Sequence, residues 1–371
     1  MLAVAVVAIV GCTHQPHDAA FFADATPVEP AFAPGDLRAT GVSRHPASAA
    51  APSGAVQLSV MTYNVHGLPY PLRRDGVQAM VAIAHELRRQ QAAGAAPDVV
   101  LIQEGFLDSV RAIADVAGYA HVAEGPGPDD TAANDTVSAA GRGVERGLAA
   151  TARLDKGETL GPLLGSGLHV FSRHPIVAVD RLAFGRHACA GYDCLANKGA
   201  LLVRLRVPGV ADDVQVLTTH LNSRGPSGVS DDRSNAAHGV QVARLAAFLS
   251  DKADPRLPLL FGADLNTKRS PPRRDTAARH LADFTPAHIS CRAQPQDCAL
   301  GEGIDAAAHW LDARDLQGYR DGWRVRVEPV AVTAAFDRPV DGKMLSDHVA
   351  ITAVYRLQGH TRIAVAAPSA F

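Results

Sequence analysis

Short apolar runs recur along the middle of this chain, and each lies next to a polar signature. The runs occupy positions 56–61, 99–102, 214–217, 257–261 and 349–355. Their length and their content of valine, isoleucine, leucine and phenylalanine predict buried strands. The signatures follow the first four runs and precede the fifth. We therefore expect polar side chains from distant parts of the chain to gather at one edge of a sheet.

The signatures contain residue types that perform chemistry. In chain order they read Tyr63-Asn64-Val65, Ile102-Gln103-Glu104, Thr219-His220-Leu221-Asn222, Gly262-Ala263-Asp264-Leu265-Asn266 and Ser346-Asp347-His348. Carboxylate oxygens such as those of Glu104, Asp264 and Asp347 suit a hard cation like Mg²⁺, and histidines exchange protons near neutral pH. The combination indicates metal-assisted hydrolysis of a phosphoester.

Four of these residues are acids or amides that follow an apolar run. Glu104 is our principal metal ligand, because a carboxylate that leaves a buried strand needs a partner or a cation to stay charged. Asn64 can add an uncharged oxygen or a phosphate contact. Asp264 and Asn266 are two residues apart, so they point the same way from an extended backbone and can orient water and hold a phosphoryl oxygen. Taken alone, each has a simpler interpretation, a surface acid or a turn.

Two histidines lie beside the predicted strands. A single histidine is more often a structural hydrogen-bonding group than a catalyst. With two of them, His220 and His348, one can accept a proton while the other stabilises or protonates the leaving oxygen, and Asp347 flanks the second. A metal ion would offset the charge that grows on the phosphoryl group.

Between the runs, helical and loop patterns alternate. Apolar residues at helical spacing predict helices within 74–90 and around 242–249. Three long polar segments predict loops, at 123–147, 223–239 and 268–303. Two of these follow site signatures directly, so we expect them at the rim of the site. The basic residues Arg269, Arg273 and Arg274 lie among prolines, and we interpret them as part of a solvated loop.

Composition favours one large folded domain. The chain has 371 residues, of which 47% are hydrophobic, and no internal repeat. The 36 Lys and Arg nearly balance the 38 Asp and Glu, which weakens a nucleic-acid substrate without excluding it. We expect the catalytic domain at 56–358, a disordered Pro- and Ala-rich tether at 13–55, and a loose tail at 359–371.

The first residues resemble an export signal. The apolar run 2–10 is too short for a membrane span of about 20 residues. It ends in Ile9-Val10-Gly11-Cys12, which resembles a bacterial lipobox and implies cleavage before Cys12 and lipidation of its thiol. A buried N-terminal strand is the alternative. The lipobox interpretation predicts an extracytoplasmic lipoprotein, held at the cell envelope through its lipid anchor or secreted.

The other cysteines form two close pairs, which agrees with an oxidising compartment. We expect disulfides Cys189–Cys194 and Cys291–Cys298. A zinc site is a rival, although neither pair has two-residue spacing or a histidine at finger-like distance. Free buried thiols are a third alternative.

All five signatures in this order resemble the endonuclease/exonuclease/phosphatase superfamily, from Val56 to Leu357. The resemblance implies a four-layer αββα sandwich, two mixed β-sheets with helices outside. It implies that Glu104 and Asn64 hold Mg²⁺, with Mn²⁺ or another divalent cation as alternatives, and that Asp264 and Asn266 position phosphate and nucleophile.

The resemblance also implies roles for the histidines. His348 would activate water or contact phosphate, with Asp347 beside it as a further catalytic and metal-binding residue. His220 would act as an acid or transition-state donor. Asp305, in Gly303-Ile304-Asp305, is similar to the acid that orients the last histidine, although the alanines that follow depart from the family pattern.

Within the superfamily the chain is most similar to bacterial sphingomyelinase-type phosphodiesterases. The similarity rests on Ser172-Arg173-His174-Pro175-Ile176, Leu195-Ala196-Asn197-Lys198-Gly199 and Thr219-His220-Leu221. It implies phosphate contacts by Lys198, which can equally cap a strand, and by Asn222. The segment after His220 departs from that branch, and with 5% aromatic residues we find no aromatic hairpin suited to entering a bilayer.

We therefore predict a Mg²⁺-dependent phosphodiesterase that prefers a phospholipid headgroup bond of the sphingomyelin kind. A secreted metal-dependent nuclease, acting on DNA or RNA with the same centre, is the nearest alternative. A surface binding protein that kept the fold without turnover is another, although a pure binder has no need of two proton carriers beside a cation site. The sequence implies no obligate protein partner.

Overall fold

The computed structural model describes residues 54–131, 138–302, 304 and 313–359. The predictions for Cys12 and Asp305 lie outside these residues, as do those for the tether up to position 53 and for the tail from position 360. Within them, no helix combines the length and the apolar character that crossing a membrane requires.

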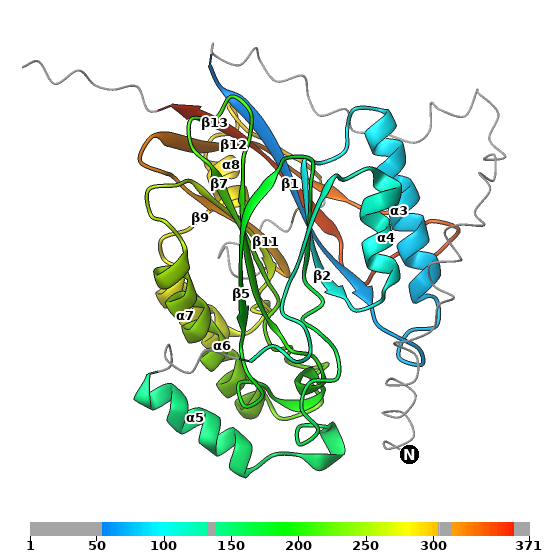
Figure 1. Ribbon diagram of the computed structural model, residues 1–371, viewed down its shortest axis with the longest axis vertical. Coiled ribbons are helices and arrows are strands. Elements are labelled where there is room, and N and C mark those ends of the chain that lie inside the picture. The colour runs from blue at the N-terminus through cyan, green and yellow to red at the C-terminus, as the bar shows by residue number, and fades with distance from the viewer. Residues whose placement is uncertain (1–53, 132–137, 303, 305–312, 360–371) are drawn as a thin grey trace, which may run out of the picture.

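Two mixed sheets form the centre of the molecule (Figure 1). Within the described residues, one has seven strands in the order β10-β12-β13-β1-β2-β4-β3 and the other has six in the order β5-β6-β7-β8-β11-β9. The strands of the first are β1 Val56–Gly67, β2 Val99–Gly105, β3 His121–Glu124, β4 His169–Ser172, β10 Ala299–Leu300, β12 Val325–Ala335 and β13 Ala350–Gly359. Those of the second are β5 Ile176–Ala183, β6 Gly199–Leu205, β7 Val214–Thr219, β8 Leu259–Asp264, β9 Thr285–Pro286 and β11 Asp315–Arg320.

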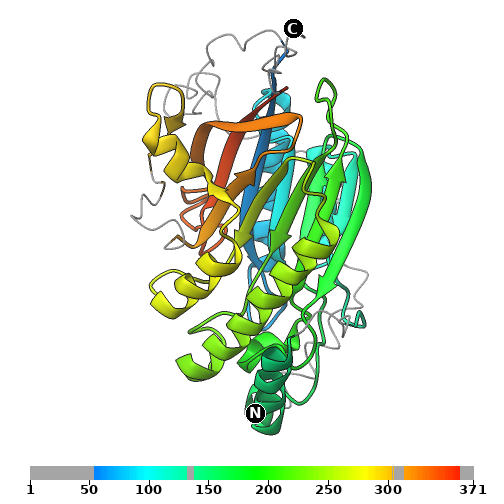
Figure 2. The same ribbon diagram turned by 90° about the vertical axis from the view of Figure 1, so that its left-hand side faces the viewer.

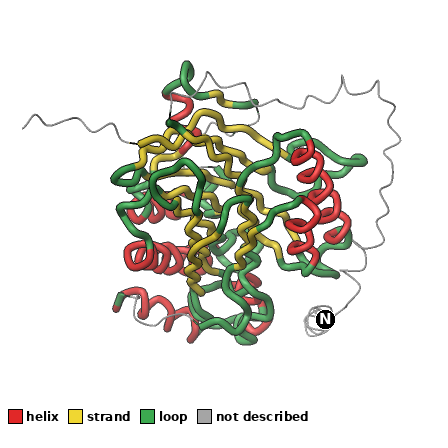
Figure 3. Tube along the Cα trace, turned by 45° about the horizontal axis from the view of Figure 1, so that its top comes forward, coloured by secondary structure: helices red, strands yellow, loops and turns green. Residues whose placement is uncertain are grey.

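Helices cover the outer face of each sheet (Figures 2 and 3). Against the seven-stranded sheet lie α3 (Gly76–Ala92) and α4 (Ser109–Ala117), and against the six-stranded sheet lie α6 (Asp231–Lys252) and α7 (Pro271–His280). Helix α5 (Ala139–Ala150) packs on α6, and α8 (Ala287–Ala293) contacts β12. The predicted four-layer αββα sandwich is confirmed.

Alternation along the strands builds three apolar layers. In β1, Leu58 and Val60 face the core between the sheets, whereas Met61 and Tyr63 belong to the cluster under α3 and α4. Successive side chains of a strand point to opposite faces, so a strand buried on both sides reads as the continuous apolar run seen in the sequence. The five predicted strands and both predicted helices are present.

The three polar segments that we predicted as loops contain helices. They hold α5, the first turns of α6, and both α7 and α8. Polar caps start two of them: Ser138 accepts a hydrogen bond from the Gly141 amide, and Ser230 accepts one from the Arg233 amide. The prediction failed because the polar segments themselves bury few apolar side chains: α5 buries Leu148, and the apolar residues of α6 lie mostly beyond position 239. In α7, for example, Arg273 and Ala277 are the buried residues.

The structure contains the two expected disulfides. Cys189 and Cys194 are joined across η4 (Gly191–Leu195), and Cys291 in α8 is joined to Cys298 just before β10. Both bridges close short loops, with sequence separations of 5 and 7 residues. The zinc alternative is therefore wrong for these four cysteines.

Strand direction decides where the polar signatures go. β1 runs parallel to β2, and β7 runs parallel to β8, so the carboxyl ends of each pair lie at the same edge. β13 is antiparallel to β1, which places the start of β13 at that edge. This topology brings the five signatures together, as the sequence predicts.

Candidate functional site

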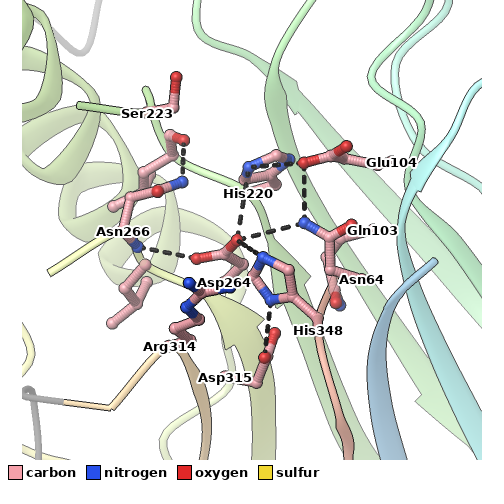
Figure 4. A network of polar contacts seen from close by, with 12 residues as sticks. Asn64, Gln103, Glu104, His220, Ser223, Asp264, Asn266, Arg314, Asp315 and His348 are labelled. Carbon is pink, nitrogen blue, oxygen red and sulfur yellow. Dashed lines mark hydrogen bonds and ion pairs between the residues drawn. The ribbon is translucent and has the colours of Figure 1, made fainter. Parts of the chain in front are cut away.

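Residues from both sheets meet at this edge (Figure 4). The Nδ2 atom of Asn64 on β1 lies 2.8 Å from Oε1 of Glu104 on β2 and 3.2 Å from Oδ2 of Asp264 on β8. Glu104 and Asp264 are 160 residues apart in sequence, yet one amide bridges their carboxylates. Three of the predicted site residues therefore form one cluster.

Both predicted histidines join this cluster. His220 follows β7, and its Nε2 atom lies 3.8 Å from Oε1 of Glu104 and 3.7 Å from Oδ2 of Asp264. His348 precedes β13, and its Nε2 atom lies 3.8 Å from the same Oδ2 atom. One oxygen of Asp264 thus faces two imidazoles and an amide (Figure 4).

The backbone at this edge adopts conformations that L residues rarely adopt. Glu104, Asn266 and His66 have φ values of 55°, 53° and 50°. Such conformations need support from their surroundings and are frequent at functional sites. A glycine at position 67 permits the close approach of Glu104, because a Cβ atom there would lie 2.7 Å from the carbonyl oxygen of Glu104.

Asp264 and Asn266 form the turn that the sequence also allowed. The Asn266 amide N–H donates to Oδ1 of Asp264 at 2.9 Å, and its Nδ2 atom donates to the Leu221 carbonyl at 3.0 Å. The turn and the site are not alternatives here. Since Oδ1 of Asp264 is held by the turn, Oδ2 is the oxygen directed to the histidines.

The acids of the cluster are buried close together. Burial raises the pKa of Glu104, against the hydrogen bond from Asn64 and the charge of Lys198. Burial and then the charge of Asp315 raise the pKa of Asp264. Buried carboxylates of this kind favour a bound cation, and the oxygens of Glu104 and Asp264 match the preference of a hard divalent ion. Contrary to our prediction, the oxygen of Asn64 is not presented to the site, because it accepts a hydrogen bond from the His66 amide at 3.0 Å. The residues fit a divalent metal.

The two histidines have opposite pKa shifts. Burial, followed by the charge of Lys198, holds the pKa of His220 well below its usual value. Burial also acts to lower the pKa of His348, but the hydrogen bond and charge of Asp315 outweigh it and raise the pKa to about 9. His220 is therefore neutral near pH 7, whereas His348 is protonated and positively charged.

Asp315, at the start of β11, is a site residue that the sequence did not reveal. Its Oδ2 atom lies 2.8 Å from Nδ1 of His348, and it pairs with Asp264 across β11 and β8. The acid that holds His348 is Asp315, whereas we expected Asp305. Asp264, Asp315 and His348 also offer ligand atoms within 4.8 Å of one another. No apolar run marks the start of β11, so the sequence gives no signal for Asp315. Its role follows from its pairing with Asp264 on β8 in the structure.

Asp347 does not join the cluster, contrary to our prediction. Its side chain is 59% exposed, and its carboxylate lies 3.6 Å from Nδ1 of His66 and 4.0 Å from Nη1 of Arg314. Among the described contacts, none joins it to Glu104 or Asp264. The neighbouring Ser346 has a structural role, because its hydroxyl donates a hydrogen bond to the Asn64 carbonyl at 2.7 Å.

Lys198 and Asn222 are buried next to the site and engaged with protein atoms. The Lys198 ammonium contacts Asp193 Oδ1 at 2.7 Å, the Leu221 carbonyl at 2.9 Å and His220 Nε2 at 3.2 Å, which matches its three N–H groups. The Asn222 side chain accepts from the Ala190 amide and donates to the Ser223 carbonyl. Either residue would have to exchange a partner to contact phosphate.

Comparisons with known proteins agree with this geometry. The model of the Endonuclease/Exonuclease/phosphatase family matches residues 61–348. Sphingomyelinase C from Streptomyces griseocarneus has a similar structure, with 21% identity, a TM-score of 0.53 and coverage of 81% of this chain and 99% of that chain. No curated protein matches the chain by sequence.

Two further solved structures share the fold. Staphylococcus aureus beta toxin (F277A, P278A mutant) with bound magnesium ions is 15% identical, with a TM-score of 0.54, over 80% of this chain and 99% of that chain. D. rerio TDP2 complexed with a single-strand DNA product is 14% identical, with a TM-score of 0.52, over 81% of this chain and 98% of that chain. At these identities the likeness concerns the fold.

Proposed function

Because this chain belongs to the endonuclease/exonuclease/phosphatase family, whose members are phosphoric ester hydrolases, we propose that it uses Mg²⁺ to hydrolyse a phospholipid headgroup diester. The family places the protein among metal-dependent enzymes that act on phosphodiesters. Mg²⁺ and the lipid substrate are the finer parts of the proposal. The observation that carries it is the convergence of Glu104, Asp264, His220 and His348 around one point.

In this proposal Glu104 holds the cation, and Asn64 orients the carboxylates of Glu104 and Asp264 through its amide N–H groups. When bound, Mg²⁺ supplies positive charge to the phosphoryl oxygens and lowers the pKa of nearby groups. Asp264 orients the attacking water through Oδ2, since its other oxygen is fixed by Asn266.

The two histidines handle protons at defined atoms. Asp315 accepts a hydrogen bond from Nδ1 of His348, so Nε2 is the atom that faces the site. With a pKa of about 9 the ring is protonated near pH 7, so its Nε2–H contacts a phosphate oxygen and can give a proton to the leaving oxygen. The neighbouring carboxylates make this ring the more basic of the two. Neutral His220 is the ring that can accept the proton that the attacking water loses, while the protonated His348 supplies the proton for the leaving oxygen.

An exposed hairpin beside the site supports a lipid substrate. Val340 and Lys343 pair across a tight turn in which Asp341 and Gly342 have φ values of 50° and 78°. Val340 and Met344 are 44% and 40% exposed, a few residues before His348. Our sequence search for an aromatic hairpin overlooked this aliphatic one, which presents apolar side chains and a lysine together.

A second exposed pair lies on the loop after β1. Tyr70 and Leu72 are 59% and 58% exposed. Arg73 ties this loop to the base of the hairpin, because it donates to the carbonyls of His66 and Leu345. Apolar residues on two connected loops favour a lipid surface over a polynucleotide, which binds chiefly to positive charge.

We further propose that the protein acts outside the cytoplasm, attached through a lipid on Cys12. The two disulfides support an oxidising compartment. Mass spectrometry of the membrane fraction would test this, because a diacylated or triacylated Cys12 peptide is expected and a free Cys12 thiol would contradict it.

A phosphoester panel tests the enzymatic proposal. Sphingomyelin vesicles should release phosphocholine in Mg²⁺, and a chelator should abolish release. Nicking of supercoiled plasmid without lipid hydrolysis would replace the lipid proposal with the nuclease alternative. No turnover of any diester, with ligand binding unchanged in Asp264→Ala protein, would support a binding protein instead.

A further inference from the structure

Arg273 lies in the third position of α7 and is 1% exposed. Among the described residues it is the largest fully buried side chain, whereas the sequence suggested that it belongs to a solvated loop. Burial lowers the pKa of Arg273 to about 10. Burial of a guanidinium destabilises the fold unless hydrogen bonds offset the loss of water. The contacts of Arg273 therefore show which parts of the chain it stabilises.

The guanidinium bonds the backbone directly after two site residues. Nη1 donates to the Asn222 carbonyl at 2.6 Å and to the Asn266 carbonyl at 3.1 Å. Asn222 is two residues beyond His220, and Asn266 is two residues beyond Asp264. One side chain thus holds the loops that follow β7 and β8.

Two further bonds fix the guanidinium itself. Nη2 donates to the Ser223 carbonyl at 3.3 Å, and Nε donates to Oδ1 of Asn235 on α6 at 2.6 Å. Among the described residues its hydrogen-bond acceptors are three carbonyl oxygens and an amide oxygen. The planar fork of arginine can reach such a set, whereas the single ammonium of lysine cannot.

The neighbouring contacts make the same connection. Asn266 donates to the Leu221 carbonyl, which links the two loops, and the buried His238 of α6 contacts the Leu265 carbonyl at 2.9 Å through Nε2. Asn266 has a φ of 53°, a conformation that depends on such support. Released from Arg273, the loops would lose a shared anchor next to both His220 and Asp264.

We propose that Arg273 is a positioning residue, which holds His220 and Asp264 in their relative geometry by clamping the two loops. This inference rests on the proposed function, because the relative positions of His220 and Asp264 matter for hydrolysis of the substrate. A displacement of about 1 Å at a catalytic group can lower the rate about 100-fold. Arg273 therefore acts on kcat through His220 and Asp264.

The experiment compares Arg273→Met, Arg273→Lys and Arg279→Met, an exposed position on the same helix. Circular dichroism selects a temperature at which each variant is folded. With sphingomyelin vesicles, we expect kcat to fall about 30-fold or more in Arg273→Met, with KM within about threefold, and less in Arg273→Lys. Arg279→Met should match the parent.

Hydrogen exchange supplies a readout that does not depend on the substrate. The segment 262–270 should exchange about tenfold faster in Arg273→Met, because the Asn266 carbonyl loses its Arg273 donor and the turn that holds the Asn266 amide opens more often, and at the parental rate in Arg279→Met. A folded Arg273→Met protein with parental kcat and parental exchange would overturn the inference. If the parent hydrolyses no diester, the proposed function fails, and exchange alone decides the clamp.

If Arg273→Met does not fold, Asn235→Ala takes its place. That change removes the bond to Nε and leaves the guanidinium present. We expect a smaller fall in kcat, about threefold, and faster exchange in 262–270. Unchanged values for both would count against the clamp.

Discussion

The two ends of the six-stranded sheet are both rich in charge, but they arrange it differently. At the end away from the site, Arg206 pairs with Asp213, Arg256 with Asp254 and Arg324 with Asp212. These pairs line an open cavity of about 620 Å³ beside the exposed Trp323. Each carboxylate there has its own arginine, and the arginines extend into water.

At the site end the carboxylates are buried and lack such partners. Glu104 and Asp264 share the Asn64 amide and the His220 imidazole, His348 faces Asp264 alone, and no arginine pairs with either acid among the described ion pairs. Exposed pairs contribute little to stability, whereas buried acids without counter-ions destabilise a fold unless something else stabilises them. Charge density alone therefore does not identify a functional site in this molecule. The site is identified by carboxylates that are buried without a counter-ion.

The largest expected effect is at the buried acids. Either Asp264→Ala or His348→Ala should lower kcat at least ~100-fold, because each removes a positioned acid, base or charge stabiliser. Steady-state release of phosphocholine measures it. The matched change at the other end, Asp254→Ala, should leave kcat within about twofold. Equal effects at the two ends would erase the contrast between them.

Asp315→Asn should have the next largest effect. The neutral amide no longer raises the pKa of His348, so we expect kcat to fall about tenfold and the pH profile of kcat to shift. Asp315→Glu should recover part of the rate if the role is to hold the ring. A profile identical to that of the parent would exclude a coupling between Asp315 and His348.

The same pair predicts a pH dependence of stability in chelator. The pKa of His348 is about 9 in the folded protein and near 6.5 when unfolded. Its contribution is therefore fully present below pH 6.5 and is lost as the pH rises towards about 9. Denaturant titrations at pH 6 and pH 9.5 should show a larger loss for the parent than for His348→Gln. Equal losses in both proteins would contradict this.

The hairpin gives the smallest effect on turnover. Val340→Ser with Met344→Ser should lower hydrolysis of vesicles about fivefold, because two exposed apolar side chains no longer contact lipid. Hydrolysis of a soluble short-chain diester should not change. Val177→Ser, an equally exposed valine at the other end of the sheet, is the control. Equal losses on both substrates would indicate damage to the site instead.

Much of the site could be read from the sequence because strand direction is regular. An apolar run followed by a polar residue predicts a strand end, and parallel neighbours bring such ends together. Asn64, Glu104, His220, Asp264 and His348 were found in this way. Asp315 escaped because β11 begins with it and no apolar run precedes it. Arg273 was not identified, because the residues next to an arginine in the chain do not indicate whether its side chain is buried or exposed.

Asp347 shows a complementary error. Its place between Ser346 and His348 suggested a ligand, but the chain turns its carboxylate towards His66 and Arg314 in solvent. Adjacent residues share a motif without sharing a direction. The side-chain direction depends on how β13 enters the sheet, which no local pattern specifies.

By itself the sequence determined the five strands that carry the signatures, two of the helices, the disulfide pairs and the family, because each depends on local periodicity or on short spacings. The tertiary structure alone decided which acid holds His348, which arginine is buried under the loops and which carboxylate faces water. Those outcomes depend on packing between segments far apart in the chain. The free energy of burying a charge is set by what surrounds it in space.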